Sequence, residues 1–262
     1  MLIICNGTFK SGSSWIHAIV LELFRVKNMQ LSEIPIMYNS NLKSPTRILE
    51  KKLSLFLNNE EYIKSTYVTK AHYFSKSTLE REYLENVKFI FIERDVKDAI
   101  VSHYYHFNNY RKIGFDFSVY FNLIGVFKAY EMCLFNQRCK ANFNANLFFS
   151  FEDFKSSFLS SVKKLCALLE IKDLTDLELL EIQKNTSLNT MKGIAKKGGN
   201  QYYPELKGDS HKLFRKGNVG DWKEHFSKIN LRIINKIINK NPPVYVKIGY
   251  FILFTLRRKI GF

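Results

Sequence analysis

The chain has 262 residues, of which 46% are hydrophobic and 15% aromatic, enough to bury the core of one domain. Its 40 lysines and arginines outnumber the 24 acidic residues, giving a net charge of +16. This charge indicates an anionic partner such as a nucleotide, a nucleic acid, a polyanionic acceptor or an acidic membrane. The longest apolar stretch, residues 244–256, is interrupted by Lys247 and is shorter than the ~20 residues that span a bilayer, so we expect no transmembrane helix.

The cysteines and the first residues predict a cytoplasmic protein. Cys5, Cys133, Cys139 and Cys166 form no CxxC pair and no zinc-binding spacing, which favours buried thiols in a reducing compartment. The apolar run 2–5 has no basic region before it and gives way at once to polar residues, unlike a signal peptide.

Strand and helix patterns alternate along the chain. Three apolar runs that end in polar residues predict core strands, each followed by a helical pattern: 2–5 by 14–26, 87–93 by 96–107, and 146–151 by 155–170. A shorter strand is expected at 67–70, and further helices at 178–184 and 229–239. This alternation predicts the α/β class, with a central parallel sheet flanked by helices.

The chain has no internal repeats and no flexible linker, so we expect one domain over residues 1–243. After Pro242 and Pro243, residues 244–262 form an apolar and basic tail, which predicts peripheral contact with a membrane or, equally, packing on the core. Residues 192–213 are polar and rich in Gly and Lys, which indicates a long loop that is functional or disordered.

The first strand runs into the loop 7–14 (GTFKSGSS), and a helical pattern follows. Glycines let backbone N–H groups approach an anion, and the helix N-terminus adds a partial positive charge, so this segment predicts a phosphate site. The spacing of Gly7 and Gly12 matches a Walker A loop, but Ser13 stands where that motif has its lysine. The lysine lies inside the loop instead, at position 10, which disfavours a nucleoside triphosphatase.

The segment 9–15 (FKSGSSW) resembles the P-K-S-G-T-T-W loop of sulfotransferases that use 3′-phosphoadenosine 5′-phosphosulfate (PAPS), with Phe9 in place of proline. The resemblance implies a P-loop nucleotide-kinase-like fold and binding of the 5′-phosphosulfate. The residues carried over to that role are Lys10, Ser11, Gly12, Ser13, Ser14 and Trp15.

Two further segments resemble parts of the same family that bind the 3′-phosphate. Residues 94–107 are similar to R-N-P-K-D-x-x-x-S-x-Y-x-H-F, with Arg94 and Ser102 at the phosphate-contacting positions. Residues 215–223 resemble R-K-G-x-x-G-D-W-K, which closes over the nucleotide in the family and implies a role for Arg215, Lys216 and Gly217. An arginine fork and a serine hydroxyl suit a phosphate on chemical grounds as well.

The adenine side matches the family less closely. Thr186, Leu188 and Met191 stand in a T-S-F-x-x-M pattern, with leucine replacing the aromatic. Phe151 replaces the tyrosine of Y-E-D, and Trp15 is expected to stack on the base. The family's dimer signature, expected after residue 222, is not matched, so that dimer cannot be inferred from the resemblance.

Lys70, Ala71 and His72 resemble the family's K-T-H. In an extended chain residues i and i+2 share a face, so Lys70 and His72 can point to one reaction centre. The resemblance makes His72 the base for the acceptor hydroxyl, Lys70 a contact for the transferring group and Lys10 the cation at the leaving oxygen. With lysines supplying the positive charge, we expect no metal.

The predicted activity is transfer of a sulfuryl group from PAPS to a hydroxyl, with adenosine 3′,5′-bisphosphate as product. The acceptor is expected to be a small molecule, a lipid or a saccharide, lined by residues 30–52, 73–78, 104–115 and 192–213. A P-loop kinase or nucleotidase is an alternative, as is a PAPS-binding protein without turnover. A nucleic-acid-binding module is suggested by the charge, but no recognition helix, zinc knuckle or RNP-like strand is evident, so we expect no nucleic-acid partner.

Overall fold

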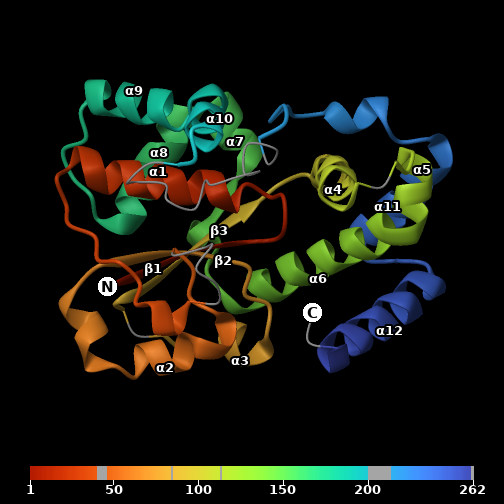
Figure 1. The fold of residues 1–262 in the computed structure, drawn as a ribbon, viewed down its shortest axis with the longest axis horizontal. Coiled ribbons are helices and arrows are strands. Elements are labelled where there is room, and N and C mark those ends of the chain that lie inside the picture. Colours follow the sequence, from red (N-terminus) through yellow and green to blue (C-terminus); the bar gives the residue numbers. More distant parts are fainter. Residues whose placement is uncertain (40–45, 84, 113, 200–213, 261–262) are drawn as a thin grey trace. The chain divides into compact units, whose positions relative to one another are not determined.

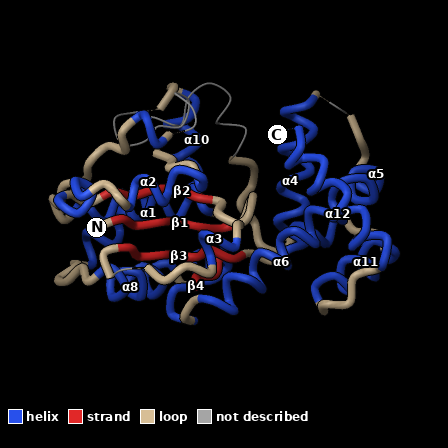
Figure 2. The backbone as a smooth tube through the Cα atoms, turned by 90° about the horizontal axis from the view of Figure 1, so that it is seen from below, coloured by secondary structure: helices blue, strands red, loops and turns tan. Residues whose placement is uncertain are grey.

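Four parallel strands make the central sheet: β1 (Leu2–Gly7), β2 (Tyr67–Ala71), β3 (Val87–Glu93) and β4 (Phe148–Ser150). Their order is β2-β1-β3-β4, with Leu2 opposite Tyr67 on one side and Val87 on the other (Figure 2). All six residues of β1 are buried, as expected for a central strand covered on both faces. The predicted α/β class with a parallel sheet flanked by helices is confirmed.

The computed structural model describes residues 1–39, 46–83, 85–112, 114–199 and 214–260. Within it the chain forms two compact units. The first comprises residues 1–93 and 142–217 and contains the sheet, whereas the second comprises residues 94–141 and 218–262 and is helical. No helix of the described residues is long and apolar enough to cross a membrane.

Helices of the first unit lie on both faces of the sheet (Figure 1). The α-helices are α1 (Ser13–Val26), α2 (Leu53–Leu57), α3 (Lys76–Leu79), α7 (Phe151–Ser156), α8 (Phe158–Leu169), α9 (Asp176–Asn185) and α10 (Leu188–Lys196). The 3-10 turns are η1 (Ile36–Tyr38), η2 (Glu50–Lys52), η3 (Glu60–Lys64) and η5 (Ala145–Leu147). On one face Ile3 and Ile90 pack with Ile19 of α1, Leu165 of α8 and Leu179 of α9. Full burial of one such aliphatic side chain contributes about 1.5–3 kcal/mol.

Aromatic rings from β3 fill the opposite face of the sheet. Phe89 and Phe91 point to the same side because they are two residues apart in a strand. Phe143 packs against both, at 4.9 and 4.7 Å between ring centroids, and Phe148 of β4 stacks on Phe91 at 4.8 Å. The short strand β4 is therefore held by ring packing as well as by its pairing with β3.

The second unit is built from α-helices and shorter turns. Its elements are α4 (Val96–Arg111), α5 (Phe117–Tyr120), the π-helical η4 (Phe121–Gly125), α6 (Val126–Asn142), the 3-10 turn η7 (Asp221–Glu224), α11 (Lys228–Ile238) and α12 (Val244–Ile260). Phe226 packs edge-on against Phe117 and Phe121, 4.8 and 5.2 Å away, and joins the segment after η7 to α5 and η4.

Several predicted boundaries differ from the structure. The strand expected at 146–151 spans only Phe148–Ser150, because the Ser150 hydroxyl accepts a hydrogen bond from the Asp153 amide and caps α7. The helix expected at 155–170 is divided into α7 and α8 at Ser157, whose backbone leaves the helical region. The predicted loop 192–213 begins inside α10, and its residues 200–213 lie outside the described part. Among the cysteines, Cys5, Cys139 and Cys166 are buried and Cys133 is half-buried.

Candidate active site

The loop between β1 and α1 turns through backbone conformations that favour glycine. Lys10 and Gly12 both have positive φ, 60° and 106°. A Cβ on Gly12 would lie 2.9 Å from the Phe151 ring, so a side chain there would be strained and crowded. The buried Ser11 fixes the turn, because its hydroxyl donates to the Thr8 carbonyl at 2.8 Å.

The N-terminus of α1 fits an anion. Gly12 is its N-cap residue, no side chain caps it, and its first turn carries no acidic residue. Amides at a helix start need acceptors, and the helix dipole favours negative charge at that end. Ser13 and Ser14 begin the helix and Lys10 precedes it, so residues suited to a phosphate or phosphosulfate surround this end.

Lys70 and His72 lie beside this loop at the carboxyl end of β2. Lys70 pairs with Cys5 across the sheet, and its ammonium donates to the Ser14 hydroxyl at 3.2 Å. His72 Nδ1 lies 2.5 Å from the Gly7 carbonyl oxygen. Because a carbonyl only accepts, Nδ1 carries the proton and Nε2 keeps its lone pair. The structure thus brings the predicted base and both predicted lysines to one end of the sheet.

The charge state of His72 is set by its surroundings. His72 is exposed, so water reaches the ring although many protein atoms lie close to it. The surrounding protein, and next the positive charge of Arg47, lower the pKa of His72 below its usual 6.5, and Lys70 and Lys10 add to the effect. The hydrogen bond to Gly7 acts in the opposite direction. His72 is therefore neutral at physiological pH, as a base must be.

Arg47 is a site residue that sequence reasoning missed. Its neighbours pin it beside β2: the Thr46 carbonyl accepts from the Lys70 amide at 3.2 Å, and the Ile48 amide donates to the Thr69 hydroxyl at 3.0 Å. The half-buried guanidinium acts electrostatically on His72, and no carboxylate of the described residues acts on it. The only signal in the sequence was an isolated arginine within a segment expected to line the acceptor site.

Asn6, a second missed residue, holds the segment after β2 against β1. It is fully buried, and its side-chain oxygen accepts from the Tyr73 and Gly7 amides at 2.9 and 3.1 Å. Its Nδ2 donates to the Tyr73 carbonyl at 3.3 Å. Because Tyr73 directly follows His72, this amide fixes the position of the predicted base relative to the loop.

The predicted adenine side forms a mixed aromatic and aliphatic wall in the first unit. The half-buried Trp15 packs against Phe151 at 5.2 Å between centroids, and also against Phe154 and Phe158. A Cβ on Gly217 would lie 3.6 Å from Leu188, which places the start of the C-terminal motif beside α10. Half-buried Arg215 and exposed Lys216 belong to the same segment.

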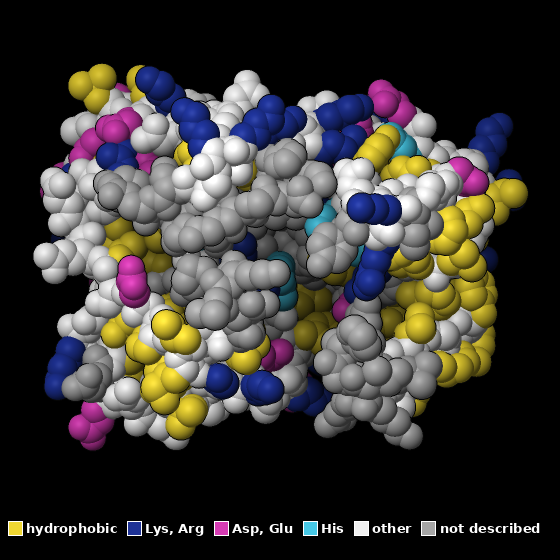
Figure 3. All heavy atoms as spheres, in the orientation of Figure 1, with side chains coloured by type: hydrophobic (Ala, Val, Ile, Leu, Met, Phe, Trp, Pro, Cys, Tyr) yellow, Lys and Arg dark blue, Asp and Glu magenta, His cyan; other side chains and the backbone are white. Residues whose placement is uncertain are grey.

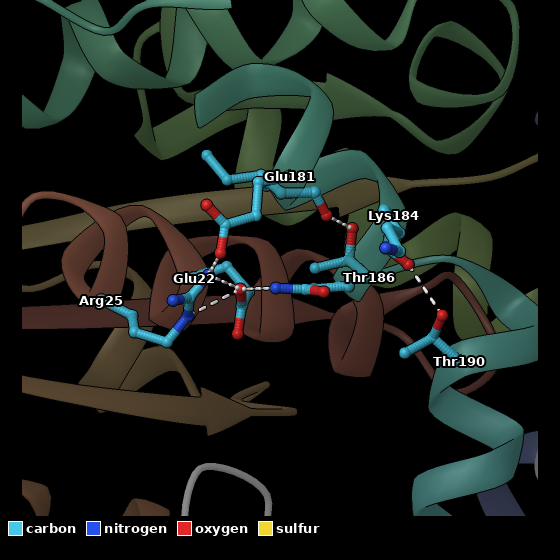
Figure 4. A network of polar contacts seen from close by, with 8 residues as sticks. Glu22, Arg25, Glu181, Lys184, Thr186 and Thr190 are labelled. Carbon is cyan, nitrogen blue, oxygen red and sulfur yellow. Dashed lines mark hydrogen bonds and ion pairs between the residues drawn. The ribbon is translucent and has the colours of Figure 1, made fainter. Parts of the chain in front are cut away.

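Thr186 and Met191 have roles within the fold. The Thr186 hydroxyl donates to the Ile182 carbonyl at 2.7 Å at the end of α9, and Met191 is buried against Ala18 of α1. Figure 4 shows how α9 is tied to α1: Glu22, which is almost fully buried, pairs with Arg25 at 2.8 Å, and Arg25 pairs with Glu181 at 2.6 Å. This network holds α9 against α1.

Arg94 and Ser102 belong to the second unit. The Arg94 guanidinium donates to the Asn218 carbonyl at 3.0 Å, and Ser102 is half-buried on α4. Asp98, which is 1% exposed, accepts from the amides of Gly220 and Trp222 at 2.7 and 3.0 Å. The start of α4 and the second half of the R-K-G-x-x-G-D-W-K segment are thereby joined within this unit.

Two further histidines, His103 and His225, make contacts within the second unit. His103 Nδ1 lies within hydrogen-bond distance of the Tyr120 hydroxyl, and His225 contacts the Tyr105 hydroxyl and the Asp221 carbonyl. Within the described ranges, no three His, Cys, Asp or Glu side chains form a group that could hold a metal ion. Of the predicted acceptor-lining segments, residues 40–45, 113 and 200–213 lie outside the described part.

Comparison with known proteins agrees with the loop and strand geometry. Residues 2–242 match the sequence model of the sulfotransferase domain. The chain is 24% identical over 254 residues to flavonol 3-sulfotransferase of Flaveria bidentis, covering 88% of this chain and 78% of that one. It is 28% identical over 246 residues to mouse sulfotransferase 2A2, covering 88% and 80%.

Solved structures share the fold. Mouse sulfotransferase SULT7A1, crystallised with PAP, superposes with a TM-score of 0.66 at 22% identity, covering 92% of this chain and 83% of that one. Retinol dehydratase in complex with androsterone and PAP gives 0.64 at 16% identity, covering 92% and 80%. With the family match spanning nearly the whole chain, and the loop, the lysines and the histidine meeting at one end of the sheet, this chain belongs to the sulfotransferase domain family.

Proposed function

We propose that this sulfotransferase takes its sulfuryl group from PAPS and passes it to a hydroxyl group of the acceptor. The observation that carries the proposal is the convergence of an uncapped helix start, Lys70 and a neutral His72 around one loop. An anionic donor suits the first two features, and removal of a hydroxyl proton suits the third.

The residues of the first unit divide the chemistry among them. PAPS supplies the sulfuryl group and a phosphate leaving group. His72 Nε2 accepts the proton of the acceptor hydroxyl, while the Nδ1 contact to Gly7 fixes the tautomer that makes this possible. Lys10 neutralises charge at the leaving oxygen, and Lys70, held by Ser14, neutralises charge on the transferring group.

The nucleotide part of the donor is assigned to the residues that match the family's motifs. Ser11, Gly12, Ser13 and Ser14 hold the 5′-phosphosulfate, and Arg94 and Ser102 hold the 3′-phosphate. Trp15, Phe151, Thr186, Leu188 and Met191 line the adenine side, and Arg215, Lys216 and Gly217 cover the nucleotide. The fit is supported by the conformation of Gly12, which leaves room only for hydrogen where the loop passes Phe151.

The acceptor is a small molecule with a hydroxyl group, and lipids and saccharides are the further candidates. One curated relative is named for flavonols, and one solved neighbour was crystallised with androsterone. In this chain the positive charge of the half-buried Arg47 acts on the base, so the acceptor hydroxyl is expected to enter next to a cation.

The direct test is transfer from sulfur-labelled PAPS to a panel of phenols, sterols, lipids and sugars. We expect labelled product together with adenosine 3′,5′-bisphosphate, and loss of transfer in Lys10→Ala.

In a second test, adenosine 3′,5′-bisphosphate should raise the melting temperature more than AMP or ATP does. A bound ligand adds RT ln(1 + [L]/Kd) to the free energy of unfolding, which is ~2.7 kcal/mol at a hundredfold excess over Kd. Mg²⁺-dependent transfer from ATP would favour the kinase alternative instead.

A further inference from the structure

Helix α12 (Val244–Ile260) begins after the last residue of the family match, which ends at 242. One side of the helix packs on α6. Val246 is fully buried, Tyr250 meets Tyr130 edge-on at 5.3 Å, and a Cβ on Gly249 would lie only 2.5 Å from the Phe127 ring. The close approach at Gly249 shows that this side already has its partner within the second unit.

The opposite side of α12 is also apolar, and it is exposed. Val244, Ile248, Phe251 and Ile252 have 70, 56, 71 and 54% of their surface accessible. The spacing i, i+4, i+7, i+8 places these four side chains on one stripe of the helix. Tyr245 and Phe254, at 52 and 42%, flank this stripe on its two sides.

Such a stripe differs from the scattered apolar side chains of an ordinary surface. Single exposed leucines are common in folded proteins, but contiguous apolar patches mark sites that bind a protein or a membrane. Figure 3 shows hydrophobic side chains gathered over the region where Figure 1 places α11 and α12. We call this stripe, together with the neighbouring Tyr245, the exposed face of α12; it comprises Val244, Tyr245, Ile248, Phe251 and Ile252.

The charges around this face select its partner. Residues 244–262 contain no Asp or Glu, while Lys247 is exposed on α12 and Arg257, Arg258 and Lys259 belong to its last turns. A second copy of the helix would bring basic residues against basic residues. An anionic lipid surface offers the complementary charge, at about 1 kcal/mol per basic residue near the headgroups, and an apolar interior for the stripe.

We propose that the exposed face of α12 docks on the surface of anionic membranes, with the helix lying in the plane of the interface. Tyr245 is placed at the level of the headgroups, where amphipathic rings are favoured, and Ile248 and Phe251 enter the acyl region. This inference is independent of the donor and of the acceptor, so its failure would leave the proposed sulfuryl transfer untouched.

The test is co-sedimentation of the full-length protein with phosphatidylcholine vesicles, with and without phosphatidylserine. Binding is expected only with phosphatidylserine and should weaken at high salt. The double variant Ile248→Glu/Phe251→Glu should reduce the bound fraction by ~10-fold or more, because two apolar anchors are lost and two like charges are added. Leu177→Glu is the matched control, since Leu177 on α9 is 80% exposed and should bind like the wild type.

Both variants change exposed side chains, so we expect each to keep the melting temperature of the wild type and its increase with adenosine 3′,5′-bisphosphate. These two measurements check that the fold is intact. The proposal is wrong if the double variant binds phosphatidylserine vesicles as the wild type does. It is equally wrong if the wild type is a dimer in light scattering that Ile248→Glu/Phe251→Glu converts to a monomer, because a second copy would then cover the face.

Discussion

The tautomer of His72 is determined by a backbone contact. The Gly7 carbonyl accepts its Nδ1 proton, so the basic nitrogen is Nε2. Gly7 ends β1 and is also a residue to which no side chain can be added, because a Cβ there would lie 2.6 Å from the Ser11 hydroxyl and 2.9 Å from the Ile92 carbonyl. The tautomer of the base therefore depends on the same close packing that forms the phosphate loop.

The first prediction concerns chemistry without binding. His72→Ala should lower kcat by ~10²-fold or more, because the acceptor hydroxyl loses its base. The Kd for adenosine 3′,5′-bisphosphate should stay near that of the wild type, since His72 meets the acceptor and not the nucleotide. Turnover and calorimetric binding measured on the same preparation check this. Near-normal turnover with a verified acceptor would assign the base elsewhere.

The second prediction concerns the cation beside that base. The pKa of His72 is lowered by the protein around it and then by Arg47, so the acid limb of kcat/KM should lie below pH 6.5. Arg47→Ala removes positive charge that disfavours the imidazolium, so the pKa should rise and the limb should move to higher pH. Arg47→Lys keeps the charge and should move the limb much less. A limb at the same pH in Arg47→Ala would rule out this electrostatic role.

At the scale of single elements, α1 buries a histidine. His17 is fully buried one turn into the helix, and burial followed by the charge of Lys70 lowers its pKa to about 3. A hydrogen bond to the backbone of Val68 on β2 acts in the other direction. The helix that carries the phosphate loop therefore holds a neutral imidazole against the strand that carries Lys70.

The third prediction follows from this burial. Between pH 6.5 and about 3 the unfolded chain binds a proton at His17 that the folded chain does not, so acidification lowers the free energy of unfolding. Over that window His17 contributes a slope of at most ~1.4 kcal/mol per pH unit. His17→Met should flatten the decline measured by urea unfolding from pH 6.5 to 4. An equally steep decline in the variant would assign the acid sensitivity to other groups.

Elements with strong local signals were predicted well from the sequence. The strand expected at 87–93 is β3 residue for residue, and the helix expected at 14–26 begins one residue earlier. The expected face-sharing of Lys70 and His72 agrees with their contacts to Ser14 and Gly7. These features depend on apolar runs and on residue spacing, which are local properties of the chain.

Features that depend on contacts distant in sequence were not predictable. Arg47 acts on His72 because the segment that contains it is hydrogen-bonded alongside β2. Asn6 acts through its hydrogen bonds to Tyr73, which is distant in sequence. The helical tail was missed for a different reason. Its residues are apolar on two sides and are rich in Val, Ile, Tyr and Phe, residue types that strands also favour, so the sequence indicated only an apolar segment.

At the scale of the whole molecule, residues assigned to the donor come from both compact units. Lys10 and Ser14 belong to the unit with the sheet, and Arg94 and Ser102 belong to the helical unit. The fourth prediction is that Arg94→Ala raises the Kd for adenosine 3′,5′-bisphosphate by ~10-fold or more, as expected for the loss of a charge-assisted hydrogen bond.

The control for this prediction uses the ligand instead of the protein. Affinity for AMP, which lacks the 3′-phosphate, should be nearly unchanged in Arg94→Ala, so the ratio of the two dissociation constants should fall. Arg81→Ala, on a side chain that lies over Tyr83 away from the assigned residues, should leave the ratio as in the wild type. If Arg94→Ala keeps the wild-type ratio of the two dissociation constants, Arg94 does not bind the 3′-phosphate.

The pairing of β1 with two later strands also determines when the protein can fold during its synthesis. Leu2 needs Tyr67 on one side and Val87 on the other, so β1 has no neighbour in the sheet until both have been translated. Until then the run 2–5 is an apolar segment exposed to solvent, the kind of segment that chaperones bind. Long-range parallel pairing is also slow to form. The run 2–5 is therefore buried only late in synthesis, once both partner strands are available.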